Sequence, residues 1–178
     1  MNFNLPDTVT VSGTEYPVRT DFRTILEIFV MLDDPDLTDA DKTEALLRMF
    51  YLERPENTEA AVEAFANFAN PRRGSSKHDA RLIDWSQDFP LMVAPVNHIL
   101  GCECRSLPEL HWHSFLAAYL EIPPESVFAR VLRIREKLRT GKKLEKNERT
   151  WYRKNIDLVT LRPKFSASEE EILSAWSK

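Results

Sequence analysis

Four residues with metal-binding side chains lie within a dozen positions of one another, namely Cys102, Cys104, His111 and His113. Thiolate and imidazole groups are zinc ligands, and structural sites usually space their cysteines about two to four residues apart and their histidines about three to five apart. In this sequence a single residue separates the members of each pair. On a helix, histidines two positions apart would point about 200° from one another. We therefore expect no metal site here.

A run of aspartates could suggest calcium instead. An EF-hand loop begun at Asp34 needs glycine at its sixth position and glutamate at its twelfth. The sequence has Asp39 and Ala45 at these positions. Aspartate also accepts hydrogen bonds from free backbone amides in turns and at helix starts. We interpret the run as turn and cap chemistry.

Motifs of enzymatic catalysis are not recognisable in the sequence. It contains no Gly-x-Ser-x-Gly elbow, no His-Glu-x-x-His pair and no glycine-rich phosphate loop. Glycine, which close backbone approach to phosphates favours, occurs only 4 times. We predict a protein without enzymatic activity and without a cofactor. An enzyme with a dispersed site is the alternative that one sequence leaves open.

Basic residues gather in one segment of an otherwise acidic chain. Residues 1–70 hold 14 acids against 5 Lys and Arg, a net charge of −9, whereas residues 130–154 hold 11 Lys and Arg against 3 acids, a net charge of +8. Helical spacing arranges the candidate binding residues in two stripes: Lys142, Lys146, Arg149 and Arg153 in one, and Arg130, Arg133 and Lys137 in the other. Such a face can be merely solvated, can bind an acidic protein surface such as a second copy, or can contact phosphates. A pair between Glu145 and Arg149 would weaken the positive field locally.

Hydrophobic periodicity predicts a mainly helical protein of about six to eight helices after a short β-hairpin at 9–18. The hairpin turns at Ser12-Gly13. The first helix starts at Thr20 or Asp21 and ends before Pro35, and the second begins with a capping box of Thr38 and Asp41. A third, capped by Asn57 or Thr58, precedes an exposed loop at 70–79.

The sequence of the second half predicts five further helices. The expected caps are Ser86, for a helix toward Leu100 that Pro90 and Pro95 shorten or kink, and Ser106 with Glu109. Pro123-Pro124 stops that second helix, after which Glu125 or Ser126 begins a longer one that Gly141 ends. A helix carrying Leu144, Trp151, Tyr152 and Ile156 follows, and Ser168 with Glu171 caps a last one.

Length and composition are those of an ordinary globular protein. The chain has 178 residues, 43% hydrophobic and 29% charged. We predict one helical domain over 1–162 and a tail over 163–178 with a short amphipathic helix. No run of about twenty apolar residues could span a membrane, residues 1–10 do not look like a secretory signal, and the two cysteines are no disulfide framework. A cytosolic protein is expected.

The order of several blocks resembles the bacteriophage gene-product-fifteen family. The blocks are the hairpin ending in GTEYPVRTDFR, the acidic helix LTDADKTEALLRMFY, the helix ELHWHSFLAAYL and the segment NERTWYRKN. The resemblance spans roughly residues 8–161. Members belong to the tail-morphogenesis module of long-tailed phages, near the gene for the tape-measure protein.

This resemblance implies a tail-assembly chaperone in the cytoplasm of the bacterial host. Its partners would be the tape-measure protein or other tail proteins, with self-association possible and nucleic acid the alternative partner. The basic residues of 130–154 are the candidate docking surface.

Overall fold

The computed structural model describes residues 4–70 and 82–169. This part is mainly helical, with nine helices of which seven are substantial, preceded by a two-stranded antiparallel hairpin, as predicted. The predicted loop at 70–79 lies, beyond Asn70, outside the described residues, and so does Glu171. Among the described helices, none combines the length and apolarity needed to cross a membrane.

The described chain forms two compact units. Unit 1 contains residues 4–70, 109–113 and 163–169, and unit 2 contains residues 82–108 and 114–162. The predicted organisation, one domain over 1–162 followed by a tail, stays a prediction. The first tail residues belong to unit 1, where the Lys164 ammonium lies 3.3 Å from Asp33 and the Ala167 amide donates to Asp36.

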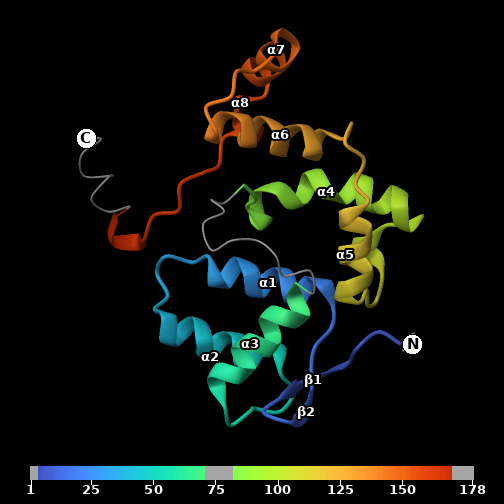
Figure 1. Cartoon of the computed structure of the whole chain (residues 1–178), viewed down its shortest axis with the longest axis vertical. Helices are drawn as coiled ribbons and strands as arrows, with labels where there is room; N and C mark the ends of the chain where they lie inside the picture. Colours follow the sequence, from blue (N-terminus) through green and yellow to red (C-terminus); the bar gives the residue numbers. More distant parts are fainter. Residues whose placement is uncertain (1–3, 71–81, 170–178) are drawn as a thin grey trace. The chain divides into compact units, whose positions relative to one another are not determined.

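Unit 1 begins with the hairpin and three helices (Figure 1). Their bounds are β1 Thr8–Val11, β2 Thr14–Pro17, α1 Phe22–Leu32, α2 Asp39–Phe50 and α3 Thr58–Ala69. At the hairpin turn Ser12 and Gly13 have φ angles of 51° and 87°, the two positive values that a type I′ turn requires.

The predicted helix starts of unit 1 are confirmed. Asp21 accepts from the Arg23 amide at the start of α1, and Asn57 accepts from the Ala60 amide at the start of α3. Thr38 and Asp41 form the capping box of α2. The sequence places these helices correctly because each cap satisfies amides that have no partner within the helix.

A later segment completes the core of unit 1. The Phe22 amide donates to Leu110, the Trp112 amide donates to Thr20, and the Asp21 carboxylate accepts from the Leu110 amide. The buried Trp112 indole donates to the Ala69 carbonyl and lies edge-on to Phe29. The helix predicted from Ser106 is therefore wrong in its start. Helix α5 spans Trp112–Leu120 because the backbone before it is bonded to unit 1.

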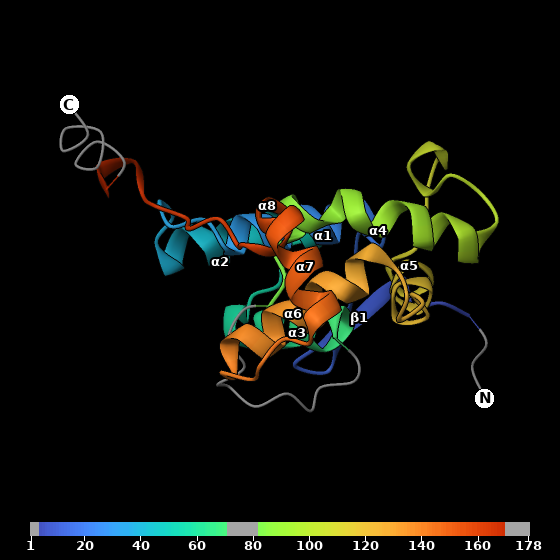
Figure 2. The ribbon, with the colours of Figure 1, turned by 90° about the horizontal axis from the view of Figure 1, so that it is seen from above.

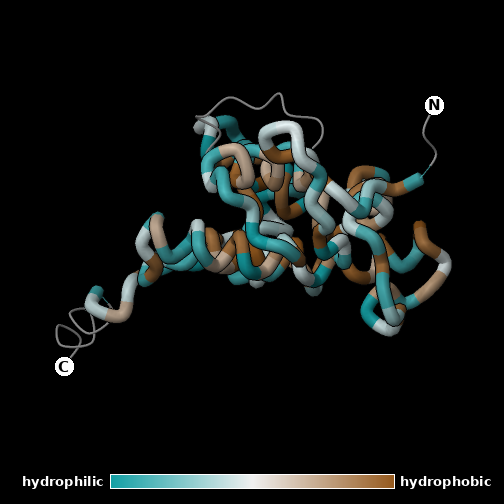
Figure 3. The backbone as a smooth tube through the Cα atoms, turned by 90° about the horizontal axis from the view of Figure 1, so that it is seen from below, coloured by the Kyte–Doolittle hydropathy of each residue, from teal (hydrophilic) through white to brown (hydrophobic). Residues whose placement is uncertain are grey.

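Unit 2 contains α5 from Ser114 onward and the remaining elements, which Figure 2 shows from above. Their bounds are α4 Trp85–Leu100, the 3-10 helix η1 Cys104–Ser106, α6 Val127–Arg139, α7 Lys146–Lys154 and α8 Ile156–Val159. Helix α8 packs against both α6 and α7, and α4 packs against α6. Figure 3 shows hydrophilic and hydrophobic residues alternating at short intervals along the helices, the pattern of elements that bury one face.

Helix α4 ends at Leu100, as predicted, but differs from its prediction in its cap and is not shortened by its prolines. Asp84 rather than Ser86 caps it, and it runs for 16 residues through Pro90 and Pro95. Each proline removes one helical hydrogen bond and costs about 3 kcal/mol in a helix interior. The helix continues because its inner face buries three apolar side chains, each worth about 1.5–3 kcal/mol. These are Met92, Val93 and Val96.

Helix α6 begins and ends as the sequence predicts. Ser126 accepts from the Ala129 amide. Beyond the last turn, Gly141 has a φ of 67°, its amide donates to Leu138, and the Lys142 amide donates to Lys137. These two bonds form a Schellman motif, in which the left-handed glycine ends the helix. The chain then turns toward α7.

The last described turn is capped by a different pair from the one predicted. Ser166 and Glu169 exchange hydrogen bonds, with the Ser166 amide donating to the Glu169 carboxylate and the Glu169 amide donating to the Ser166 hydroxyl. Ser168 lies inside this turn. A capping box two residues earlier satisfies the same need for an acceptor.

Candidate functional site

The seven predicted binding residues come from two helices and the connection between them. Arg130, Arg133 and Lys137 lie on α6, and Lys146, Arg149 and Arg153 lie on α7. Lys142 lies in the connection before α7, so only three residues of the predicted four-residue stripe lie on the helix. All four members of that stripe are exposed.

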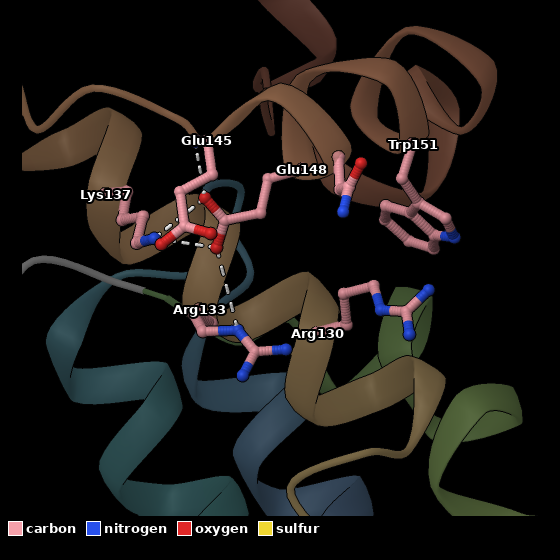
Figure 4. A pocket seen from close by; sticks show the side chains of 7 residues that line it. Arg130, Arg133, Lys137, Glu145, Glu148 and Trp151 are labelled. Atoms are coloured by element: carbon pink, nitrogen blue, oxygen red, sulfur yellow. Dashed lines mark hydrogen bonds and ion pairs between the residues drawn. The ribbon is translucent and has the colours of Figure 1, made fainter.

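An open cleft of about 460 Å³ lies between α6 and α7 (Figure 4). The three predicted binding residues of α6 line it, together with four residues from the N-cap and body of α7: Glu145, Asn147, Glu148 and Trp151. The surface is therefore of mixed charge rather than uniformly basic. The sequence prediction named its cations and Glu145 but not Glu148.

Glu148 neutralises one of the predicted cations. The Lys137 ammonium donates to both of its carboxylate oxygens, each at 2.7 Å, and the Glu145 amide donates to Oε2 at 2.9 Å. The pKa of Glu148 is held below its ordinary value mainly by the hydrogen bond from Lys137. The bond from the Glu145 amide is the second cause. Lys137 therefore contributes little free positive charge to the cleft.

Arg133 is held only loosely. Its Nε lies 3.9 Å from Glu148 Oε1, too far for a hydrogen bond, and its side chain is 49% exposed. At this distance and exposure an ion pair is weak. The guanidinium N–H groups of Arg133 are accordingly accessible to another acceptor.

Arg130 is positioned by an aromatic ring. Its guanidinium carbon lies 5.3 Å from the centroid of the Trp151 ring, within the range of a cation–π contact. The ring itself packs with Leu144 and Tyr152 against the core formed by Val131, Ile134 and Val159. The hydrophobic attachment of α7 thus fixes the ring on which Arg130 rests.

The α7 stripe has fewer internal contacts. The predicted pair between Glu145 and Arg149 does not form, because Arg149 donates to the Leu144 carbonyl at 3.3 Å. The Glu145 amide bonds to Glu148 and keeps Glu145 at the start of the helix. The stripe remains an exposed row of positive charge.

The two histidines, for which the sequence predicts no metal site, hydrogen-bond to the protein backbone. His111 Nδ1 accepts from the His113 amide at the start of α5, which leaves its Nε2 to donate to the Pro6 carbonyl. His113 Nε2 donates to the Phe68 carbonyl. The rings contact each other, with centroids 5.2 Å apart, because His111 precedes the helix rather than lying on it. The predicted 200° separation is wrong for this reason.

The two cysteines have different environments in unit 2. Cys102 is exposed, whereas Cys104 is buried and its amide donates to the Asn97 side chain. Burial raises the pKa of the Cys104 thiol. Within residues 4–70 and 82–169, no three His, Cys, Asp or Glu side chains converge as metal ligands would. That the chain binds no metal stays a prediction.

The comparison with protein families bears on the first half of the chain. Residues 1–84 match the family model described as Bacteriophage Gp15 protein. Over these residues the chain is similar to the Gp15 family. The predicted resemblance is confirmed here, while its markers at 110–112 and 151–154 lie beyond the matched Gp15 region.

Further comparisons add no relative. No curated protein and no solved structure matches the chain. The cleft between α6 and α7 also lies beyond the matched Gp15 region.

Proposed function

We propose that this protein is a non-enzymatic accessory protein of phage tail assembly, which acts in the cytoplasm of the bacterial host as a chaperone of the tape-measure protein. The family match over residues 1–84 supports the phage setting. The choice of partner follows from the position of the family in the tail-morphogenesis module. Self-association remains compatible with this role.

The observation that carries the binding role is the exposed positive surface of α6 and α7. Lys142, Lys146, Arg149 and Arg153 are exposed, and the two arginines of the cleft have accessible N–H groups. A long helical partner needs a chaperone to cover its apolar face before assembly, and the two proteins must bind in a defined register. Charged faces set register and steer the encounter, whereas apolar contact supplies affinity.

Nucleic acid is the alternative partner for the same cations. Glu145 and Glu148 line the cleft beside the arginines, and their charges oppose a phosphate backbone there. Lys137 is already paired with Glu148. These contacts favour a protein partner over a polyanion.

Co-expression with the tape-measure protein of the same gene cluster tests the proposal. Affinity purification of this chain should recover a soluble complex, although the tape-measure protein is insoluble when expressed alone. Reversal of two stripe charges, Lys146→Glu with Arg149→Glu, should reduce recovery strongly.

The matched control reverses two exposed arginines elsewhere in unit 2, Arg105→Glu with Arg162→Glu. It should leave recovery of the complex unchanged. An insoluble tape-measure protein in the presence of the wild-type chain, with none co-purified, contradicts the chaperone role. Equal recovery with the stripe variant refutes docking through the stripe.

A further inference from the structure

We infer that the cleft between α6 and α7 is the docking site of an acidic, amphipathic helical segment of a partner protein, whose carboxylates bind Arg130 and Arg133. This inference rests on the proposed function in one respect, that the chain acts by binding another protein. It specifies which chemical groups the partner segment must carry.

The internal ion pairs decide which cations of the cleft are available. Three basic and two acidic side chains line it, so its formal charge is positive by one unit. Lys137 and Glu148 satisfy each other at 2.7 Å. In the described part of the chain, no carboxylate hydrogen-bonds to either Arg130 or Arg133. The unmatched charge therefore lies on the two guanidinium groups, which Figure 4 shows on the α6 side of the cleft.

The two guanidinium groups match carboxylates on a helix. Arg130 and Arg133 are three residues apart on α6, which places their Cβ atoms about 5–6 Å apart on one face. Carboxylates three or four residues apart on a partner helix have the same spacing. Each guanidinium can hold a carboxylate through two parallel hydrogen bonds. The Trp151 ring keeps Arg130 in place before binding, which reduces the entropy lost on docking.

Exposed apolar surface lies beside the two arginines. Val127 is 47% exposed and precedes Arg130 by one helical turn, on the same face of α6. Trp151 lines the cleft, and its ring contacts Arg130. A partner helix with an apolar residue beside its carboxylates would cover this surface. The occupant is thus amphipathic as well as acidic.

The two glutamates of the cleft argue against a polyanion. Glu145 and Glu148 are close to any group that enters, and Lys137 offsets only one of them. Separate carboxylates can reach the arginines while an apolar face passes the glutamates. A phosphate backbone carries a charge at every nucleotide and lacks this spacing.

Titration calorimetry with three probes tests the inference on the purified full chain. The first is a synthetic helical peptide of Ala and Leu with Glu residues four apart, the second replaces every Glu by Lys, and the third is a single-stranded DNA of about the same length. The Glu peptide should bind at physiological salt and the other two should not. Arg130→Gln with Arg133→Gln should weaken Glu-peptide binding about tenfold or more.

A matched control and a second variant separate binding from folding. Arg105→Gln with Arg139→Gln removes the same charge outside the cleft and should leave the affinity unchanged. Glu148→Gln frees Lys137 and should tighten Glu-peptide binding several-fold. If Glu148 mattered only for the fold, this variant would bind no better. Circular dichroism verifies that each variant is folded.

Several results would overturn the inference. These are equal binding of the Lys peptide, preferred binding of DNA, or a dimer that the arginine variant dissociates, which would make a second copy the occupant. The peptide experiment does not involve the tape-measure protein. The chaperone proposal and the cleft proposal can therefore be refuted separately. Peptide binding without recovery of the tape-measure protein refutes only that partner, whereas the reverse result refutes only the cleft.

Discussion

The guanidinium of Arg135 holds both carboxylate oxygens of Asp88, at 2.6 and 2.9 Å, and both side chains are buried. The remaining N–H groups of Arg135 donate to the carbonyls of Leu82, Leu158 and Val159. The Asp84 amide adds a further bond to Asp88 Oδ2. All five donors of the guanidinium are thus satisfied, and α4, α6 and α8 are joined by one side chain.

Removing one member of this pair should destabilise unit 2 severely. Asp88→Asn or Arg135→Leu leaves the other group buried without its counter-charge, which costs about 3–5 kcal/mol. Urea denaturation measures the free energy of unfolding. The control Arg139→Gln breaks an exposed pair with Glu136 and should cost less than about 1 kcal/mol. A loss of similar size in both would contradict the role assigned to burial.

The Glu148 carboxyl should make stability depend on acidity in a defined direction. Its pKa is lower in the folded chain than in the unfolded chain, where glutamate titrates near about 4.3. Its contribution is therefore complete above that value and disappears as the pH falls through the folded value. The difference in unfolding free energy between wild type and Glu148→Gln should shrink between pH 7 and pH 3. A difference independent of pH would show that the Lys137 pair does not stabilise the fold.

His111 should stabilise the start of α5. His111→Ala removes the acceptor for the His113 amide and the donor to Pro6, and loss of such a cap costs about 1 kcal/mol. His98→Ala, at an exposed position of α4, should change the unfolding free energy by less than about 0.5 kcal/mol. Thermal and urea unfolding of the two variants, measured side by side, compare these values.

Gly141 should be required for the turn between α6 and α7. Its φ of 67° is unfavourable for residues with a Cβ, although nothing lies close enough to clash with one. Gly141→Ala should cost about 1–2 kcal/mol through backbone conformation alone. Gly141→Asn should cost less because asparagine tolerates this region. Equal losses in the two variants would point to a steric cause instead.

Local signals explain which elements could be predicted. Asp21, Thr38, Asn57 and Ser126 satisfy amides of the helix that they precede, so short-range patterns suffice. Ser106 carries the same signal, yet the chain that follows bonds to residues about ninety positions earlier in sequence, as the Asp21–Leu110 hydrogen bond shows. No local sequence pattern predicts a hydrogen bond between residues so far apart in the chain. The continuation of α4 through two prolines likewise depends on burial.

The candidate site could be predicted only in part. Helical spacing identified the cations of α6 and α7, because their periodicity is visible in sequence. It did not identify Glu148 as the partner of Lys137, since the two lie on different helices. The spacing of Glu145 and Glu148 fits a helix start, and this signal could have placed Glu148 at the head of α7. Its approach to α6 depends on the turn at Gly141.

The late position of Trp112 has a consequence for synthesis on the ribosome. Its indole bonds to the Ala69 carbonyl, which the ribosome completes 43 residues earlier. At about 5–20 residues per second, the N-terminal helices emerge several seconds before this ring can cover Phe29. During that interval the nascent chain displays apolar surface, and a fragment ending at residue 84 would do so permanently. The matched Gp15 region should therefore be studied together with residues 109–113.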